Sequence, residues 1–317
     1  PVGGAYPLEG RSLAVLYQSG DEWAAQYGRY EAEVPPTRLA PIIGGPPAEH
    51  RTIRGTVVTI ASFYSPELDN RRDIQVYLPR GYDDGMERYP VIYMHDGQNL
   101  FDAATSFAGT EWGVDETMER LAEQGLHAIV VGVPNMGAQR FAEYTPFEDE
   151  EHGGGRGEAY LAFLAETLKP HIDRSFRTLG GPEHTLIAGS SLGGLISLYA
   201  LLRRPETFGK AGVISPALWP ADGAIFAMVR EGEGAPGAVY LDIGTAEGEA
   251  ALAQARELAG LLEGRGYRPD ETLRYYEAEG GAHNEAAWAE RVGDALSWLL
   301  AAPHAPPAKG AAGRKRP

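Results

Sequence analysis

The stretch His184-Thr-Leu-Ile-Ala-Gly-Ser-Ser-Leu-Gly-Gly-Leu-Ile-Ser-Leu-Tyr-Ala-Leu-Leu202 decides the fold of this chain. Its first five residues are apolar enough for a short buried strand, and apolar side chains then recur at helical spacing to Leu202. Between them, Gly189-Ser-Ser-Leu-Gly193 matches G-x-S-x-G, a strand-to-helix turn that raises a serine above a sheet. A plain helix N-cap is the alternative role of Ser191, but the flanking strand and helix favour a nucleophile.

Strand-like and helical runs alternate on both sides of this stretch. The first strands follow one another without helices and the later ones alternate with helices, which predicts an antiparallel start leading into a mostly parallel sheet. The fold class is therefore α/β, with about eight strands and helices on both faces. The predicted strands are 53–61, 72–78, 90–94, 128–133, 184–189, 211–215, 238–243 and 272–277. The predicted helices are 113–124, 158–170, 192–203, 222–230, 248–264 and 285–300.

Three regions are expected along the 317 residues. Residues 1–50 are a Pro/Gly-rich N-terminal extension with one helical piece from Ser12 to Tyr30. Residues 51–302 have the length of one large domain with a single core. Residues 303–317 end in Arg314-Lys-Arg316 and are predicted to be a disordered basic tail.

Composition narrows the functional classes. A net charge of −16 argues against nucleic acid and anionic membrane surfaces as partners. The absence of cysteine excludes a thiol nucleophile, a disulfide framework and cysteine-bound zinc. We expect a cytoplasmic protein, although the chain starts at Pro1, so a removed signal peptide stays open as an alternative. Self-association to a homo-oligomer also stays open.

The candidate general base is His283. Of eight histidines, it alone falls just past the last predicted strand, within Glu279-Gly-Gly-Ala-His-Asn-Glu285. A nucleophilic serine needs a histidine at this place, after the eighth strand of such a sheet. The alternative is a histidine that caps the following helix or lies in solvent.

Two acids compete for the role of orienting this histidine. Glu247 lies in the loop after the seventh predicted strand, where the acid belongs. Asp242 lies inside that strand and could reach the same histidine if the strand stops early. Position favours Glu247, and Asp242 remains the alternative triad acid.

An oxyanion hole would take two backbone N–H groups. One comes from the residue after the nucleophile, Leu192, and the other from the loop after the third strand. That loop reads His95-Asp-Gly-Gln-Asn99, and its Gly97 or Gln98 is the predicted second donor.

Together these segments resemble the putative esterase family of α/β-hydrolases, which includes esterase D, enterobactin-type esterases, and feruloyl and acetyl xylan esterases. The likeness covers about residues 51 to 300. It implies an α/β-hydrolase fold without metal or cofactor, and hydrolysis of a small-molecule or carbohydrate-linked carboxylic ester through an acyl-enzyme. In that family a G-T-x-D/E segment supplies the triad acid, which supports Glu247, although many members carry Asp there. The matching segments are Tyr93-Met-His-Asp-Gly-Gln-Asn-Leu-Phe-Asp102, Val131-Gly-Val-Pro-Asn135, Glu143-Tyr-Thr-Pro146, Leu168-Lys-Pro-His-Ile-Asp173, Ala188-Gly-Ser-Ser-Leu-Gly-Gly194, Gly244-Thr-Ala-Glu247 and Gly281-Ala-His283.

Three residues are candidate substrate contacts. Trp219 lies in the segment that lines the acyl or sugar pocket in the resembling family, with a core tryptophan as the alternative. Arg140 could clamp an anionic or hydroxyl-bearing substrate, or form a surface salt bridge. Tyr144 is the third candidate.

Two other functions would fit the same residues. An acyltransferase would use the same triad but pass the acyl group to a sugar hydroxyl, as the related mycolyltransferases do. A binding protein would keep the fold without turnover.

Overall fold

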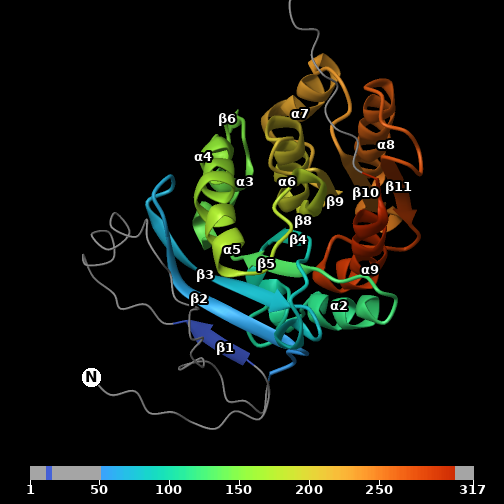
Figure 1. The fold of residues 1–317 in the computed structure, drawn as a ribbon. Helices are drawn as coiled ribbons and strands as arrows, with labels where there is room; N and C mark the ends of the chain where they lie inside the picture. The colour runs from blue at the N-terminus through green and yellow to red at the C-terminus, as the bar shows by residue number, and fades with distance from the viewer. Residues whose placement is uncertain (1–11, 16–50, 304–317) are drawn as a thin grey trace, which may run out of the picture.

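The computed structural model describes residues 12–15 and 51–303 of the chain. Nine strands form one sheet in the order β1-β2-β3-β5-β4-β8-β9-β10-β11 (Figure 1). A separate two-stranded ribbon pairs β6 with β7. The strands are β1 Ser12–Val15, β2 Thr56–Ser65, β3 Asn70–Leu78, β4 Val91–His95, β5 Ile129–Val133, β6 Glu148–Asp149, β7 Gly153–Gly154, β8 Thr185–Ser191, β9 Lys210–Pro216, β10 Ala238–Gly244 and β11 Leu273–Ala278.

The direction of the strands confirms the predicted fold class. β3 pairs antiparallel with β2 and β5, whereas β5, β4, β8, β9, β10 and β11 run parallel. The eight predicted strands correspond to β2–β5 and β8–β11, with ends that differ by a few residues. A parallel sheet of this length needs crossover connections, and the helices supply them.

The prediction of a helix from Ser12 to Tyr30 is wrong at its start. Residues 12–15 form β1, which pairs parallel with β2. The edge of β2 offers unpaired backbone N–H and C=O groups, and pairing with them outweighs a weak local preference for helix. The remainder of the predicted helix, the rest of the extension and the tail from residue 304 lie outside the described residues.

Helices cover both faces of the sheet, and each face has its own apolar cluster. α2 and α9 pack together over one face, and α4 to α8 contribute to the cluster on the other (Figure 1). Within β4, Val91 and Tyr93 belong to one cluster and Ile92 and Met94 to the other, as the two-residue period of a strand requires. The helices are α2 Val114–Ala122, α3 Arg140–Tyr144, α4 Gly157–Ala162, α5 Lys169–Ser175, α6 Leu192–Arg203, α7 Pro220–Glu231, α8 Glu249–Gly264 and α9 Glu285–Ala301.

The helix predicted over 158–170 has a π-helical segment in its middle. α4 and α5 are joined by the π turn Phe163–Leu168. Pro170 follows at the start of α5. Proline has no N–H to donate to the carbonyl of Glu166, four residues earlier, which explains why the α-helical ladder is interrupted there.

The parallel strands bring their carboxyl ends to one edge of the sheet. β4, β8, β9, β10 and β11 are consecutive in the sheet order. The segments after these five strands therefore meet at that edge, which is where α/β proteins bind ligands. In the described part of the chain, no helix has the length and apolarity to cross a membrane.

Candidate active site

The turn between β8 and α6 has the strained geometry that the G-x-S-x-G motif predicts. Ser191 has φ 56° and ψ −122°, a conformation that non-glycine residues rarely adopt. A Cβ on Gly189 would lie 2.9 Å from Cδ2 of His95 and 3.1 Å from the carbonyl carbon of Gly193. Only glycine fits there, as predicted. Such strain persists when the surroundings over-determine it, and it gathers at functional sites.

His95 supports this turn from below but cannot serve as its base. The ring is 2% exposed, and its Nδ1 lies 2.9 Å from the Tyr160 hydroxyl. Burial lowers the pKa of His95 to about 3, so the ring stays neutral at physiological pH. Its role is packing against the glycines of the turn.

His283 and Glu247 are in direct contact at the same edge of the sheet. Nδ1 of His283 lies 2.7 Å from Oε2 of Glu247, and the two side chains are 44% and 2% exposed. The two loops are tied together, since Ala246 N–H donates to the Gly281 carbonyl and Gly280 N–H to the Thr245 hydroxyl. A carboxylate on Nδ1 favours the tautomer with its proton there, which leaves Nε2 free to accept one.

Glu247 is held as a carboxylate. Burial raises its pKa, but hydrogen bonds from His283, from Ser215 and from the Gly244 N–H outweigh burial, and the pKa lies below its ordinary value. The folded state therefore favours the ionised form of Glu247. The stability that these bonds give is present above the ordinary pKa and is lost as the pH falls through the lowered one.

The alternative acid, Asp242, has other partners. Its side chain is 0% exposed and accepts from Nε of Arg291 at 3.1 Å and from the Ser215 N–H at 3.1 Å. From its position inside β10, the Asp242 side chain faces Arg291. The structure thus places Glu247, and not Asp242, against the histidine.

The loop after β4 makes a tight turn. Gly97 opens a 3-10 turn that ends at Asn99, and a Cβ on Gly97 would lie 2.5 Å from the carbonyl carbon of Gly132. Gly97 and Gln98 begin this turn and Leu192 begins α6. The first N–H groups of a helical turn have no partner within it, which is the property that the predicted oxyanion donors require.

Arg140 forms an ion pair, the alternative to the predicted substrate clamp. Its Nε and Nη2 each lie 2.8 Å from one carboxylate oxygen of Asp96, which also accepts from the Asn135 amide at 2.6 Å. This bidentate pair occupies Nε and Nη2 of a guanidinium whose side chain is 27% exposed. Asp96 directly precedes Gly97, so Arg140 stabilises the turn that contains the predicted oxyanion donors.

Tyr144 is also not a substrate contact. Its side chain is 0% exposed, and its hydroxyl accepts the Asp96 N–H at 3.1 Å. No substrate can reach it, so this prediction is wrong. The sequence places Tyr144 near the site, but its depth depends on how α3 packs beneath the β4 loop.

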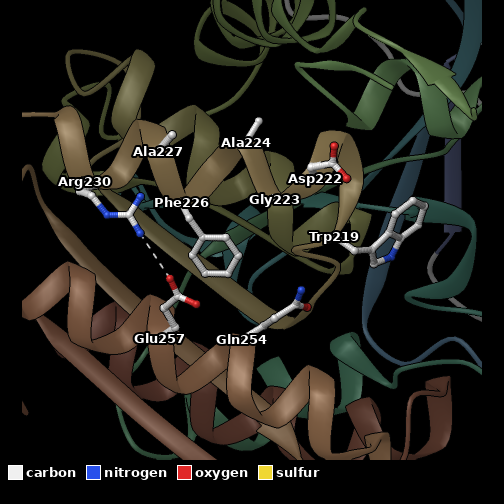
Figure 2. Close-up of a pocket in the computed structure, with 9 residues that line it drawn as sticks. All are labelled: Trp219, Asp222, Gly223, Ala224, Phe226, Ala227, Arg230, Gln254 and Glu257. Carbon is white, nitrogen blue, oxygen red and sulfur yellow. Dashed lines mark hydrogen bonds and ion pairs between the residues drawn. The ribbon is translucent and has the colours of Figure 1, made fainter. Parts of the chain in front are cut away.

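Trp219 is exposed and lies on a groove beside this edge. Its side chain is 45% exposed, which excludes the alternative of a core tryptophan. The ring stacks on Phe141 at 5.9 Å and meets the edge of His152 at 5.0 Å. It lies at one end of a groove of about 620 Å³ between α7 and α8. Figure 2 shows Phe226 in the middle of that groove and the Arg230–Glu257 ion pair at its other end.

The contact between the nucleophile and its base is one that a complete site requires. In the described chain, no hydrogen bond joins the Ser191 hydroxyl to His283. Such contacts are often long without substrate and tighten in the Michaelis complex. The part of the chain that the structure describes also contains no group of three or more His, Cys, Asp or Glu side chains arranged to hold a metal ion.

Sequence reasoning missed two residues beside Glu247. Ser215 and Arg291 lie 2.6 Å and 3.8 Å from its Oε1. In the sequence, Ser215 only begins the segment Ser-Pro-Ala-Leu-Trp219 that contains the candidate tryptophan. Arg291 is one charged residue of the predicted helix 285–300. No local pattern signals that they meet.

Comparisons with known proteins find similar chains and similar folds. A family model described as "Putative esterase" matches residues 65–299. The chain is 27% identical over 243 residues to the uncharacterized protein YbbA of Bacillus subtilis, covering 73% of this chain and 92% of that protein. It is 30% identical over 179 residues to the siderophore triacetylfusarinine C esterase of Aspergillus fumigatus, covering 52% of this chain and 59% of that protein. Among solved structures, the BES protein of Bacillus cereus matches with a TM-score of 0.60 at 24% identity, covering 78% of this chain and 95% of that one.

Proposed function

Because this chain belongs to the putative esterase family, with the family model matching residues 65–299, we propose that it hydrolyses esters through a Ser191–His283–Glu247 triad. The chain has an α/β-hydrolase fold and is a carboxylic ester hydrolase. The observation that carries the triad is the 2.7 Å contact between His283 and Glu247 at the sheet edge where β8 delivers a strained Ser191.

In the proposed mechanism Ser191 Oγ attacks the ester carbonyl carbon while Nε2 of His283 takes its proton. The tetrahedral intermediate collapses, the alcohol leaves with that proton, and an acyl-enzyme remains on Ser191. His283 then activates water to release the acid. General-base catalysis of this kind contributes on the order of 10²–10⁴-fold.

The negative oxygen of the intermediate would be held by backbone N–H groups. Leu192 supplies one and Gly97 or Gln98 the other, since all three lie at the start of a helical turn, where N–H groups have no partner within the turn. Arg140 contributes indirectly, because its ion pair with Asp96 stabilises the turn before Gly97. One such donor is worth about 2.7–4 kcal/mol of transition-state stabilisation.

The test is hydrolysis of p-nitrophenyl esters from acetate to long acyl chains. We expect turnover of at least one of them, and the preferred acyl length will describe the acyl pocket. A purified, folded protein that hydrolyses none of the panel would overturn the proposed function. Adding an acceptor alcohol separates hydrolysis from acyl transfer, because an acyltransferase would make the transferred ester as its main product.

Glu247→Gln is expected to lower kcat by about 10⁴-fold, the cost of losing the orienting carboxylate in a comparable triad. Ser215 and the Gly244 N–H both donate to Oε1 of Glu247. In the variant these two donors would bind the oxygen of the new amide, and the amide NH₂ would then face His283. That NH₂ would donate to Nδ1 and force the proton onto Nε2, where His283 is no longer a base.

The matched control for this variant is Glu277→Gln. Glu277 is a partly exposed carboxylate in β11 that pairs with Arg256. Its loss is expected to leave kcat within about twofold, because surface ion pairs contribute little. Equal kcat values for Glu247→Gln and Glu277→Gln would contradict the assignment of Glu247.

The substrate is proposed to be a small-molecule or glycan ester that lies along the groove at Trp219. The groove combines two aromatic rings, Trp219 and Phe226, with polar side chains at its rim. Such a surface suits a ring-bearing, hydroxylated group that stacks and hydrogen bonds. The Aspergillus relative is named a siderophore esterase. A siderophore ester is therefore the competing candidate for the substrate.

Trp219→Ala is expected to raise KM roughly 3- to 10-fold for the best substrate and to change kcat less, because stacking binds substrate and transition state alike. Trp219→Phe should retain most of the affinity. Tyr276→Ala is the control, since Tyr276 is an equally exposed aromatic at 45% on strand β11. An unchanged KM in Trp219→Ala across the ester panel would contradict the proposal that the groove binds substrate.

A further inference from the structure

The carboxylate of Glu247 is surrounded by more donors than a histidine-orienting acid requires. Oε2 faces His283, while Oε1 accepts from Ser215 Oγ at 2.6 Å and from the Gly244 N–H at 2.8 Å. The side chain is 2% exposed, so water does not supply these bonds. The donors on Oε1 decide the rotation of the carboxylate and therefore where Oε2 points.

The direction of the Ser215 hydroxyl is determined by Arg291. Nη2 of Arg291 donates to Ser215 Oγ at 2.7 Å. A guanidinium can only donate, so the serine oxygen must accept from it. The single hydroxyl hydrogen of Ser215 is then directed to Glu247.

Ser215 is itself held in an unfavourable backbone conformation. It is 0% exposed and has φ 40°, in the left-handed region that favours glycine. Its N–H donates to Asp242 Oδ1 at 3.1 Å. The backbone is strained, and the buried hydroxyl forms two hydrogen bonds. Such a conformation persists only where the surrounding structure enforces it.

Arg291 connects these groups to the loop of the proposed base. From α9 it donates through Nε and Nη2 to both carboxylate oxygens of Asp242, at 3.1 Å and 3.3 Å. A Cβ on Gly281 would lie 2.7 Å from its Nη1, so the loop that leads to His283 passes directly over the guanidinium. The charged groups around Glu247 are thus His283 after β11, Arg291 on α9 and Asp242 on β10.

We propose that Ser215 and Arg291 are positioning residues for Glu247. Arg291, anchored on Asp242, orients the Ser215 hydroxyl, and that hydroxyl turns Glu247 so that Oε2 meets His283. The inference rests on the proposed triad and adds residues that no sequence motif marks. Neither residue is in reach of a substrate, because Ser215 is 0% and Arg291 is 6% exposed.

The test compares Ser215→Ala with Ser215→Gly. Both variants lack the hydroxyl, but glycine also releases the strain at φ 40°. We expect both to lower kcat about 10- to 100-fold with little change in KM, as the loss of a hydrogen bond to a charged group implies. The acidic limb of the pH profile of kcat/KM should move to higher pH, because an oxygen of Glu247 without its donor stabilises a protonated His283 more strongly.

A pair of charge variants gives a second readout. Arg291→Gln removes a positive charge 3.8 Å from Oε1 of Glu247 and should move the acidic limb to higher pH, whereas Asp242→Asn removes a negative charge beside the same groups and should move it to lower pH. Shifts in the same direction would contradict the proposal. Thr185→Val is the control, because Thr185 is a buried, hydrogen-bonded hydroxyl at the amino end of β8, and its loss should leave kcat and the pH profile unchanged.

The outcomes separate this inference from the proposed function. If Ser191→Ala abolishes turnover but both Ser215 variants retain the wild-type kcat and pH profile, the positioning role fails and the triad stands. A normal kcat in Ser215→Gly with a low one in Ser215→Ala would also overturn it, because the effect would then come from backbone strain. Full activity of Ser191→Ala would instead overturn the triad itself.

Discussion

Ser191→Ala is expected to lower kcat on p-nitrophenyl acetate by on the order of 10⁶-fold, the loss measured when the nucleophile of a comparable serine enzyme is removed. The methyl group of alanine fits the same space but carries no oxygen to attack the carbonyl. The backbone at φ 56° is equally strained with either residue, so the fold and the free energy of unfolding should not change. Activity is measured by release of p-nitrophenolate, and folding by circular dichroism and urea unfolding.

The matched control is Ser190→Ala. Ser190 is the adjacent residue of β8 and is 2% exposed, but the two-residue period of the strand directs it away from Ser191. It should retain most of the activity. A Ser191→Ala protein that turns over esters at the wild-type rate, after contaminating esterases are excluded by repurification, would show that the nucleophile lies elsewhere.

His283→Ala is expected to cost nearly as much, again on the order of 10⁶-fold in kcat, because a serine without its base is a weak nucleophile. The double variant Ser191→Ala/His283→Ala should be no slower than either single variant, since the two residues act as one unit. The imidazole is 44% exposed, so the fold should persist, and the main cost to stability should be the lost hydrogen bond to Glu247.

His184→Ala tests whether this loss is specific. His184 is 43% exposed, almost the same as His283, but lies at the amino end of β8, away from the site. It should retain the wild-type kcat. If His283→Ala retains more than about a tenth of the wild-type kcat, another group must take the proton from Ser191, and the triad would need a different base.

The strands and helices were predictable because they depend on local patterns. The apolar run of β4, the helical spacing after Ser191 and the glycines of its turn all belong to short segments of sequence. Among the predicted helices and strands, the error at Ser12–Val15 concerns a strand that pairs with β2. Strand pairing across more than 40 residues leaves little local trace.

Tyr144 shows how position along the chain can mislead, and Arg140 shows how it can leave two roles open. Both lie in the segment that follows β5, and this position led to the prediction that they contact substrate. In the structure Arg140 pairs with Asp96, and the Tyr144 hydroxyl accepts the Asp96 N–H. Their depth follows from the packing of α3 under the β4 turn, and no pattern within α3 reveals it.

The sequence alone determined the α/β fold, the serine of the sharp turn and the histidine after the last strand, because each depends on neighbours a few residues away. It left two carboxylates, Asp242 and Glu247, five positions apart, and could only favour one. Tertiary structure decided between them: Arg291, from a helix far along the chain, pairs with Asp242 and leaves Glu247 facing His283. Arg291 lies closer to Asp242, at 3.1 Å, than to Glu247, at 3.8 Å, and only packing in three dimensions decides these distances.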